Sequence, residues 1–102
     1  MSRIEQLRKL AQIEPDDPLA HYGLALEWAN LEDWDQAIRS FDETLRLDPK
    51  YTAAYYHKAR AQIGAGLGQD ARNTLERGIL AANAAGDEKT AREMGELRDT
   101  IA

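Results

Sequence analysis

The chain has no cysteine among its 102 residues, only three prolines and few aromatic side chains. The absence of cysteine excludes disulfides, thiolate metal ligands and cysteine nucleophiles. No apolar run approaches the roughly 20 residues that a membrane-spanning helix requires, and the N-terminus lacks the apolar core of a secretory signal. We therefore expect no membrane association and a cytoplasmic location.

A basic surface is also missing. The formal net charge is −5, and the first 34 residues carry three basic and seven acidic side chains. Proteins that bind nucleic acid normally gather lysines and arginines on one face, because neutralised phosphates supply much of the affinity. Nucleic acid is therefore not an expected partner.

Patterns for catalysis or metal binding are absent as well. Neither His21 nor His57 has a second histidine at the i, i+4 spacing that lets two side chains of one helix hold an ion. The glycines of residues 64–68 lack the lysine and the serine or threonine of a phosphate-binding loop. We expect no enzymatic activity, no cofactor and no metal site.

What the sequence does contain is a period of 34 residues. Shifting the chain by that length aligns residues of the same kind, mainly at small or apolar positions. The identical pairs are Ile4 with Ile38, Pro15 with Pro49, Ala20 with Ala54, Tyr22 with Tyr56, Ala25 with Ala59 and Ala37 with Ala71. A fixed period of this length indicates stacked units, each unable to bury its apolar face alone.

Within each period the apolar residues recur at helical spacing. One stripe begins after Asp17-Pro18, where a carboxylate can cap the helix and proline fits its first turn. Residues 31–35 form a bend in which Asp33 and Gln36 have the spacing of a capping box, and Asp87 can cap a last helix. We predict an all-α fold of about six helices arranged as antiparallel hairpins, with no strands.

The spacing of the framework residues resembles the tetratricopeptide repeat. The matching residues are Leu24-Ala25-x-x-Trp28, then Ala37-x-x-x-Phe41, then Pro49. On this resemblance the whole chain is a single domain. It divides into a half repeat at 1–15, repeats at 18–51 and 52–85, and a C-terminal capping helix at 86–102.

The second repeat departs from the family pattern. Lys58 and Gln62 stand where the family has a leucine and an aromatic residue, and Asn83 replaces the closing proline. Gly78, inside a helix, costs about 1 kcal/mol relative to alanine unless close packing requires its missing side chain. The sequence leaves two interpretations open: a loosely packed second repeat, or a Lys58 whose stem is buried while its ammonium reaches solvent.

The resemblance implies that the first helices of the repeats line a concave groove. The candidate partner-binding residues on them are Tyr22, Leu26, Asn30, Tyr56, His57, Arg60 and Ile63. Tyrosine and arginine are common in interface hot spots, and Arg60 could pair with a ligand carboxylate, which favours acidic peptides. The alternative is that both tyrosines only pack within the fold, as we expect of Trp28, Trp34 and Phe41 in the core or the bend.

The function that the resemblance implies is non-catalytic protein–protein interaction. In this interpretation, the groove binds a peptide or a segment of a protein partner. The alternative is a self-association or scaffolding role, in which terminal helices of two copies stack to give a homodimer.

Overall fold

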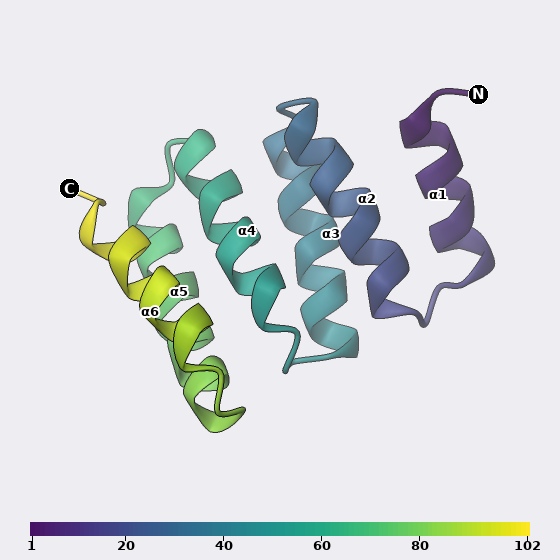
Figure 1. The fold of residues 1–102 in the computed structure, drawn as a ribbon. Coiled ribbons are helices and arrows are strands. Elements are labelled where there is room, and N and C mark those ends of the chain that lie inside the picture. Colours follow the sequence, from purple (N-terminus) through teal and green to yellow (C-terminus); the bar gives the residue numbers. More distant parts are fainter.

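The computed structural model describes residues 1–102 and contains six α-helices and no strands, which confirms the predicted all-α class (Figure 1). The helices are α1 (Arg3–Ile13), α2 (Pro18–Asn30), α3 (Trp34–Leu47), α4 (Thr52–Gly64), α5 (Gly68–Ala84) and α6 (Glu88–Asp99). Successive helices run antiparallel and are joined by short turns.

The helices form two layers. In the view of Figure 1, α2, α4 and α6 lie in front, and α3 and α5 lie behind them. The helix α3 packs between α2 and α4, and α5 packs between α4 and α6, whereas α1 contacts α2 alone. The array measures 39 × 29 × 18 Å, so it is a short and rather flat solenoid.

Three helices begin at the capping residues that the sequence predicts. Asp17 accepts a hydrogen bond from the Leu19 amide at 2.9 Å, and Asp87 accepts one from the Thr90 amide at 3.1 Å. Asp33 accepts from the Gln36 amide at 3.3 Å. The capping box is only half formed, however, because the Asp33 amide donates to the carbonyl of Trp28 and not to the Gln36 side chain.

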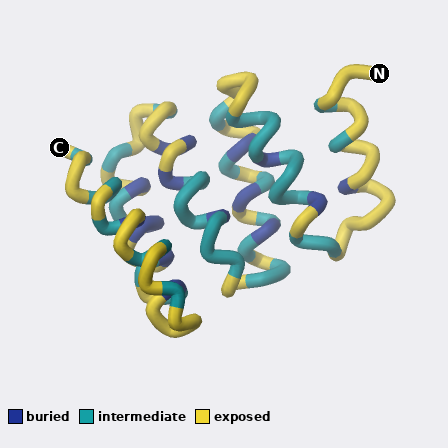
Figure 2. Tube along the Cα trace, viewed as in Figure 1, coloured by how far each residue is buried: buried dark blue, intermediate teal, exposed yellow.

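Small residues dominate the core, which lets the helices approach closely. One cluster joins α2, α3 and α4 around Phe41, and a second joins α4, α5 and α6 around Leu75 and Met94; all three of these side chains are fully buried. In Figure 2 the buried positions form a band between the two layers, and most of α1 is exposed.

Three of the four unusual residues of the second repeat are well packed, and only Asn83 is exposed. A Cβ atom added at Gly78 would lie 2.5 Å from the Met94 sulfur and 2.6 Å from the Tyr55 Cβ, so close helix packing requires this glycine. Gln62 is buried and accepts a hydrogen bond from the Thr74 hydroxyl at 2.7 Å. The Lys58 ammonium lies 2.6 Å from an Asp42 carboxylate oxygen at the surface. The structure thus decides for the second interpretation: only 18% of the Lys58 side chain is exposed, and its charge is paired with Asp42 at the surface.

Candidate functional site

A hollow of about 360 Å³ lies between α2, α4 and the start of α3, and we call it the α2–α4 groove. Its lining residues come from all three elements: Leu26, Ala29, Asn30, Glu32, Trp34, His57, Arg60 and Ala61. Four of the seven candidate partner-binding residues, Leu26, Asn30, His57 and Arg60, therefore share one depression.

The floor of the groove is apolar. Leu26 and Ala29 of α2 pack against the core cluster around Phe41, and Ala61 of α4 is itself a buried member of that cluster. Helices α2 and α4 both belong to the front layer (Figure 1), and their facing sides border the same hollow. The floor is therefore as rigid as the core beneath it.

Trp34 forms one wall, a position that the sequence analysis did not predict. It lies at the bend and packs on the core, as expected, but its ring also borders the groove. The ring fits there because Gly64 has no side chain, and a Cβ atom at that glycine would approach the indole to 2.7 Å. The available signal was a tryptophan directly after the expected N-cap Asp33, at the bend between two helices.

His57 is held among aromatic rings. It stacks over Phe41 with the ring planes 14° apart, and it meets the edges of Tyr22 and Tyr56 at centroid distances of 6.0 and 5.4 Å. Burial, together with the positive charge of Arg60, lowers the pKa of His57. The lowered pKa favours the neutral imidazole, so His57 contributes polarity rather than charge to the groove.

Arg60 supplies the positive charge. It is exposed, its guanidinium carbon lies 6.0 Å from the centre of the Tyr56 ring, and it takes part in none of the five ion pairs of the structure. An arginine held over an aromatic ring keeps its donors free for a ligand. Glu32 lies on the same hollow, so the groove has one basic and one acidic side chain.

The other three candidate residues lie elsewhere. Tyr22 is half-buried and does not line the groove; its ring centroid lies 6.1 Å from that of Phe41 and 4.8 Å from that of Tyr51, and its burial raises its pKa. Tyr56 packs against the second core cluster and reaches the groove through the cation–π contact with Arg60. Ile63 borders a separate depression beside the end of α6. Of Tyr22, Tyr56 and Arg60, only Arg60 lines the groove itself.

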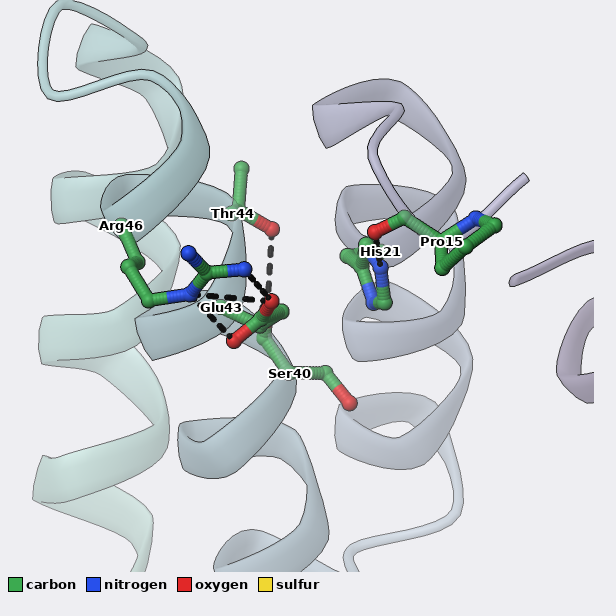
Figure 3. Close-up of polar contacts among 6 residues, drawn as sticks. All are labelled: Pro15, His21, Ser40, Glu43, Thr44 and Arg46. Carbon is green, nitrogen blue, oxygen red and sulfur yellow. Dashed lines mark hydrogen bonds and ion pairs between the residues drawn. The ribbon is translucent and has the colours of Figure 1, made fainter. Parts of the chain in front are cut away.

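The polar contacts of the first repeat are structural. Figure 3 shows a His21 ring nitrogen 2.9 Å from the carbonyl of Pro15, and Arg46 of α3 bonded to Glu43 one turn before it at 3.1 Å. The hydrogen bond with Arg46 lowers the pKa of Glu43. The Thr44 hydroxyl is bonded to the carbonyl of Ser40 at 2.8 Å.

Two kinds of site are not found in the structure. No three side chains of the types His, Cys, Asp or Glu gather closely enough to hold a metal ion. None of the six helices combines the length and the apolar composition needed to cross a membrane.

Comparison with known proteins places the chain in a family. Residues 31–92 match the model of the tetratricopeptide repeat. Over 91 residues the chain is 30% identical to a TPR repeat-containing protein of Pseudomonas aeruginosa, and the match covers 89% of this chain and 87% of that protein.

Solved structures agree in fold. A solution structure of a protein from Bordetella parapertussis superposes with a TM-score of 0.85 at 25% identity, over 99% of this chain and 88% of that one. The TPR2B domain of yeast Sti1, solved as a complex with pHsp70, superposes with a TM-score of 0.87 at 24% identity, over 93% of this chain and 76% of that one. Domains of this fold serve in general as protein–protein interaction modules and typically are not catalytic. The resemblance stated from the sequence is thus confirmed, and the chain belongs to the tetratricopeptide repeat family.

Proposed function

We propose that this chain binds a short segment of a partner protein in the α2–α4 groove and catalyses no reaction. The observation that supports this proposal most directly is the meeting of an apolar floor, the Trp34 ring and an unpaired Arg60 in one hollow. We divide the chain into a half repeat at 1–15, repeats at 18–51 and 52–85, and a capping helix at 86–102. The groove then lies between the two full repeats.

The chemistry of the groove favours a particular kind of segment. Leu26, Ala29 and the Trp34 ring offer apolar and aromatic surface, which suits one aliphatic or aromatic side chain of a ligand. Arg60 lies at the same hollow and can bind a carboxylate through two parallel hydrogen bonds. The proposed ligand therefore carries an acidic group close to an apolar side chain.

The small volume of the groove limits its affinity for a peptide. A hollow of about 360 Å³ is near the lower end for ligand sites and holds only one or two side chains. A short peptide anchored in this way is expected to bind with a dissociation constant of about 1 μM to 100 μM, since ordering of the peptide offsets much of the contact energy.

Selection from a library of short displayed peptides tests the proposal. Selected peptides are expected to be enriched in an acidic residue next to an apolar one, and to shift the NMR signals of the Trp34 indole and of α2 and α4 when titrated into the protein. Arg60→Glu is expected to weaken binding by at least about tenfold, because it replaces attraction to the carboxylate by repulsion.

Arg39→Glu is the matched control, because Arg39 is an exposed arginine of α3 that also lacks an ion-pair partner and does not line the groove. It is expected to leave binding unchanged, and both variants are expected to keep the melting temperature of the parent. Equal loss of binding in both variants, or peptide-induced shifts confined to α5 and α6, would contradict the groove proposal.

A role in self-association would use a different part of the molecule. The groove lies on α2, α3 and α4, whereas the exposed apolar residues of the terminal helix α1 lie outside it. The two kinds of interaction can therefore be tested separately.

A further inference from the structure

His57 brings ring nitrogens to the α2–α4 groove that no group of the protein binds. Its side chain takes part in none of the hydrogen bonds and ion pairs of the structure, whereas His21, the other histidine, is bonded to the carbonyl of Pro15. No buried side-chain nitrogen lacks a hydrogen bond, so the unbonded nitrogens of His57 are open to solvent. Because His57 lines the groove, they are available to a ligand there.

His57 and Arg60 lie next to each other. They are three residues apart on α4, which places their side chains one turn apart on the same side of the helix. Both pack on the ring of Tyr56: the Arg60 guanidinium carbon lies 6.0 Å from its centre, and the centroid of the His57 ring lies 5.4 Å from it. Both also line the same hollow. A ligand carboxylate bound by Arg60 therefore lies beside the His57 ring.

The surroundings of His57 hold one positive charge and no negative charge paired with it. The rings that face it are uncharged at neutral pH and come from three helices: Tyr22 of α2, Phe41 of α3 and Tyr56 of α4. Helices α5 and α6 contribute no residue to the groove. Glu32 is the one carboxylate that lines it, and it forms no ion pair with His57 or Arg60. Protonation of His57 thus places a second positive charge beside Arg60, with no anion to offset it.

We propose that His57 is a second recognition residue for the acidic group of the ligand, and that the groove binds acidic segments more tightly as the pH falls below neutral. This role rests on the proposed function, because the group recognised is the ligand carboxylate that Arg60 binds. A neutral imidazole donates a hydrogen bond to that carboxylate, and the protonated ring adds a positive charge. A carboxylate beside both cations offsets their repulsion, so His57 is easier to protonate in the complex than in the free protein.

The sign of the pH effect follows from these charges. In the free protein, burial and the charge of Arg60 hold the pKa of His57 below its ordinary value of 6.5. In the complex, the ligand carboxylate raises that pKa, so binding takes up a proton and the affinity increases as the pH falls. The side chain of a ligand aspartate or glutamate stays ionised down to about pH 4, which leaves a window between about pH 6.5 and about pH 4.5 for the effect.

Calorimetric titration of the full chain at about pH 7.5 and about pH 5 tests this role. The ligands are the acidic peptide selected from the displayed library and the same peptide with its acidic residue replaced by the corresponding amide. The acidic peptide is expected to bind about three- to tenfold more tightly at the lower pH, since protonation of His57 adds a charge-assisted hydrogen bond. The amide peptide is expected to gain no affinity.

His57→Gln removes the titration, because glutamine keeps a hydrogen-bond donor and carries no charge at either pH. It is expected to bind the acidic peptide equally at both pH values. His21→Gln is the matched control, because His21 is a half-buried histidine of α2 that does not line the groove, and it is expected to keep the pH effect. Thermal unfolding at both pH values checks that each protein is folded, since the lowered pKa of His57 makes the fold less stable as the pH falls.

NMR gives a second measurement that needs no variant. The chemical shifts of the His57 ring protons, followed against pH, give the pKa of this side chain with and without peptide. That pKa is expected to rise by about 0.5–1 with the acidic peptide, which corresponds to the three- to tenfold gain in affinity, and to stay unchanged with the amide peptide.

Equal affinity of the parent chain for the acidic peptide at both pH values would overturn this role of His57 and leave binding in the groove intact. An unchanged pKa of His57 in the complex, or a pH effect that persists in His57→Gln, would overturn it in the same way. A library that yields no acidic peptide bound at the groove would contradict the proposed function itself.

Discussion

The two central helix hairpins, α2–α3 and α4–α5, fill equivalent positions with different chemistry. Where the first has Leu24 and Trp28, the second has Lys58 and Gln62. Both of these polar side chains are paired: Lys58 forms an ion pair with Asp42, and Gln62 accepts a hydrogen bond from Thr74. No buried side-chain nitrogen or oxygen in the structure lacks a hydrogen bond. The framework therefore tolerates polar residues at apolar positions when a neighbouring helix supplies the matching group.

The hairpins also differ in how closely they approach the next helix. Gly78 of α5 allows Tyr55 and Met94 to pack directly onto its backbone, whereas the equivalent Thr44 of α3 turns its hydroxyl back to the carbonyl of Ser40. Small substitutions at these positions are thus expected to have very unequal effects in the two hairpins.

The largest effect is expected from Gly78→Ala. The new methyl group would overlap the Met94 sulfur and, more seriously, the Tyr55 Cβ, which is close to the backbone and cannot turn away. Overpacking of this kind is expected to lower the free energy of unfolding by about 2 kcal/mol, in spite of the better helix propensity of alanine.

Chemical denaturation measures this change, and Gly95→Ala in α6 is its control. The nearest atom to a Cβ at Gly95 is 3.9 Å away, at the tip of Arg98. That variant is expected to gain about 0.5–1 kcal/mol from helix propensity alone. A Gly78→Ala variant as stable as Gly95→Ala would show that α5 is not closely packed against α4 and α6 at Gly78.

A smaller loss is expected from Gln62→Leu, which makes the second hairpin more like the first. The change removes the acceptor of the buried Thr74 hydroxyl and is expected to cost about 1–2 kcal/mol. The double variant Gln62→Leu/Thr74→Val removes both polar groups and is expected to recover most of this loss. Denaturation of the two single variants and the double variant completes the cycle. Simple addition of the two single losses would mean that the pair is not coupled.

The smallest effect is expected at the turns of the two hairpins. Glu32 has a φ of 58°, the left-handed conformation that Gly66 adopts at the same position one period later. Glu32→Gly relieves this conformation and is expected to raise stability by up to about 1 kcal/mol. Thermal unfolding measures the gain, and an unchanged or lower melting temperature would show that Glu32 makes a compensating contact. Gly66→Ala is the complementary variant and is expected to lower stability by a similar amount.

Local signals in the sequence were sufficient for the helices. The apolar spacing and the caps Asp17, Asp33 and Asp87 depend on residues a few positions apart, and the 34-residue period depends only on comparing the chain with itself, so together they placed all six elements. The half-formed capping box shows the limit of such rules, since the Asp33 amide had a competing acceptor in the preceding helix.

The candidate site was only partly accessible from the sequence. Placing residues on the first helices was enough to bring Leu26, Asn30, His57 and Arg60 together. It did not show that Ile63 lies outside the groove, beside the end of α6. It also missed Trp34, because this residue belongs to α3, the second helix of its repeat. The surroundings of a side chain near the edge of a helical stripe depend on where the neighbouring helix lies. The spacing of residues within one repeat does not give that position.

The sequence by itself determined the helical class, the repeat length and the family, because periodicity and framework residues are properties of the chain. The tertiary structure alone decided that Gln62 pairs with Thr74, that Lys58 pairs with Asp42, and that α1 keeps an apolar face exposed. The physical reason is that these features depend on atoms of different helices lying within a few ångströms of each other. Only the stacking of the helices brings such atoms together.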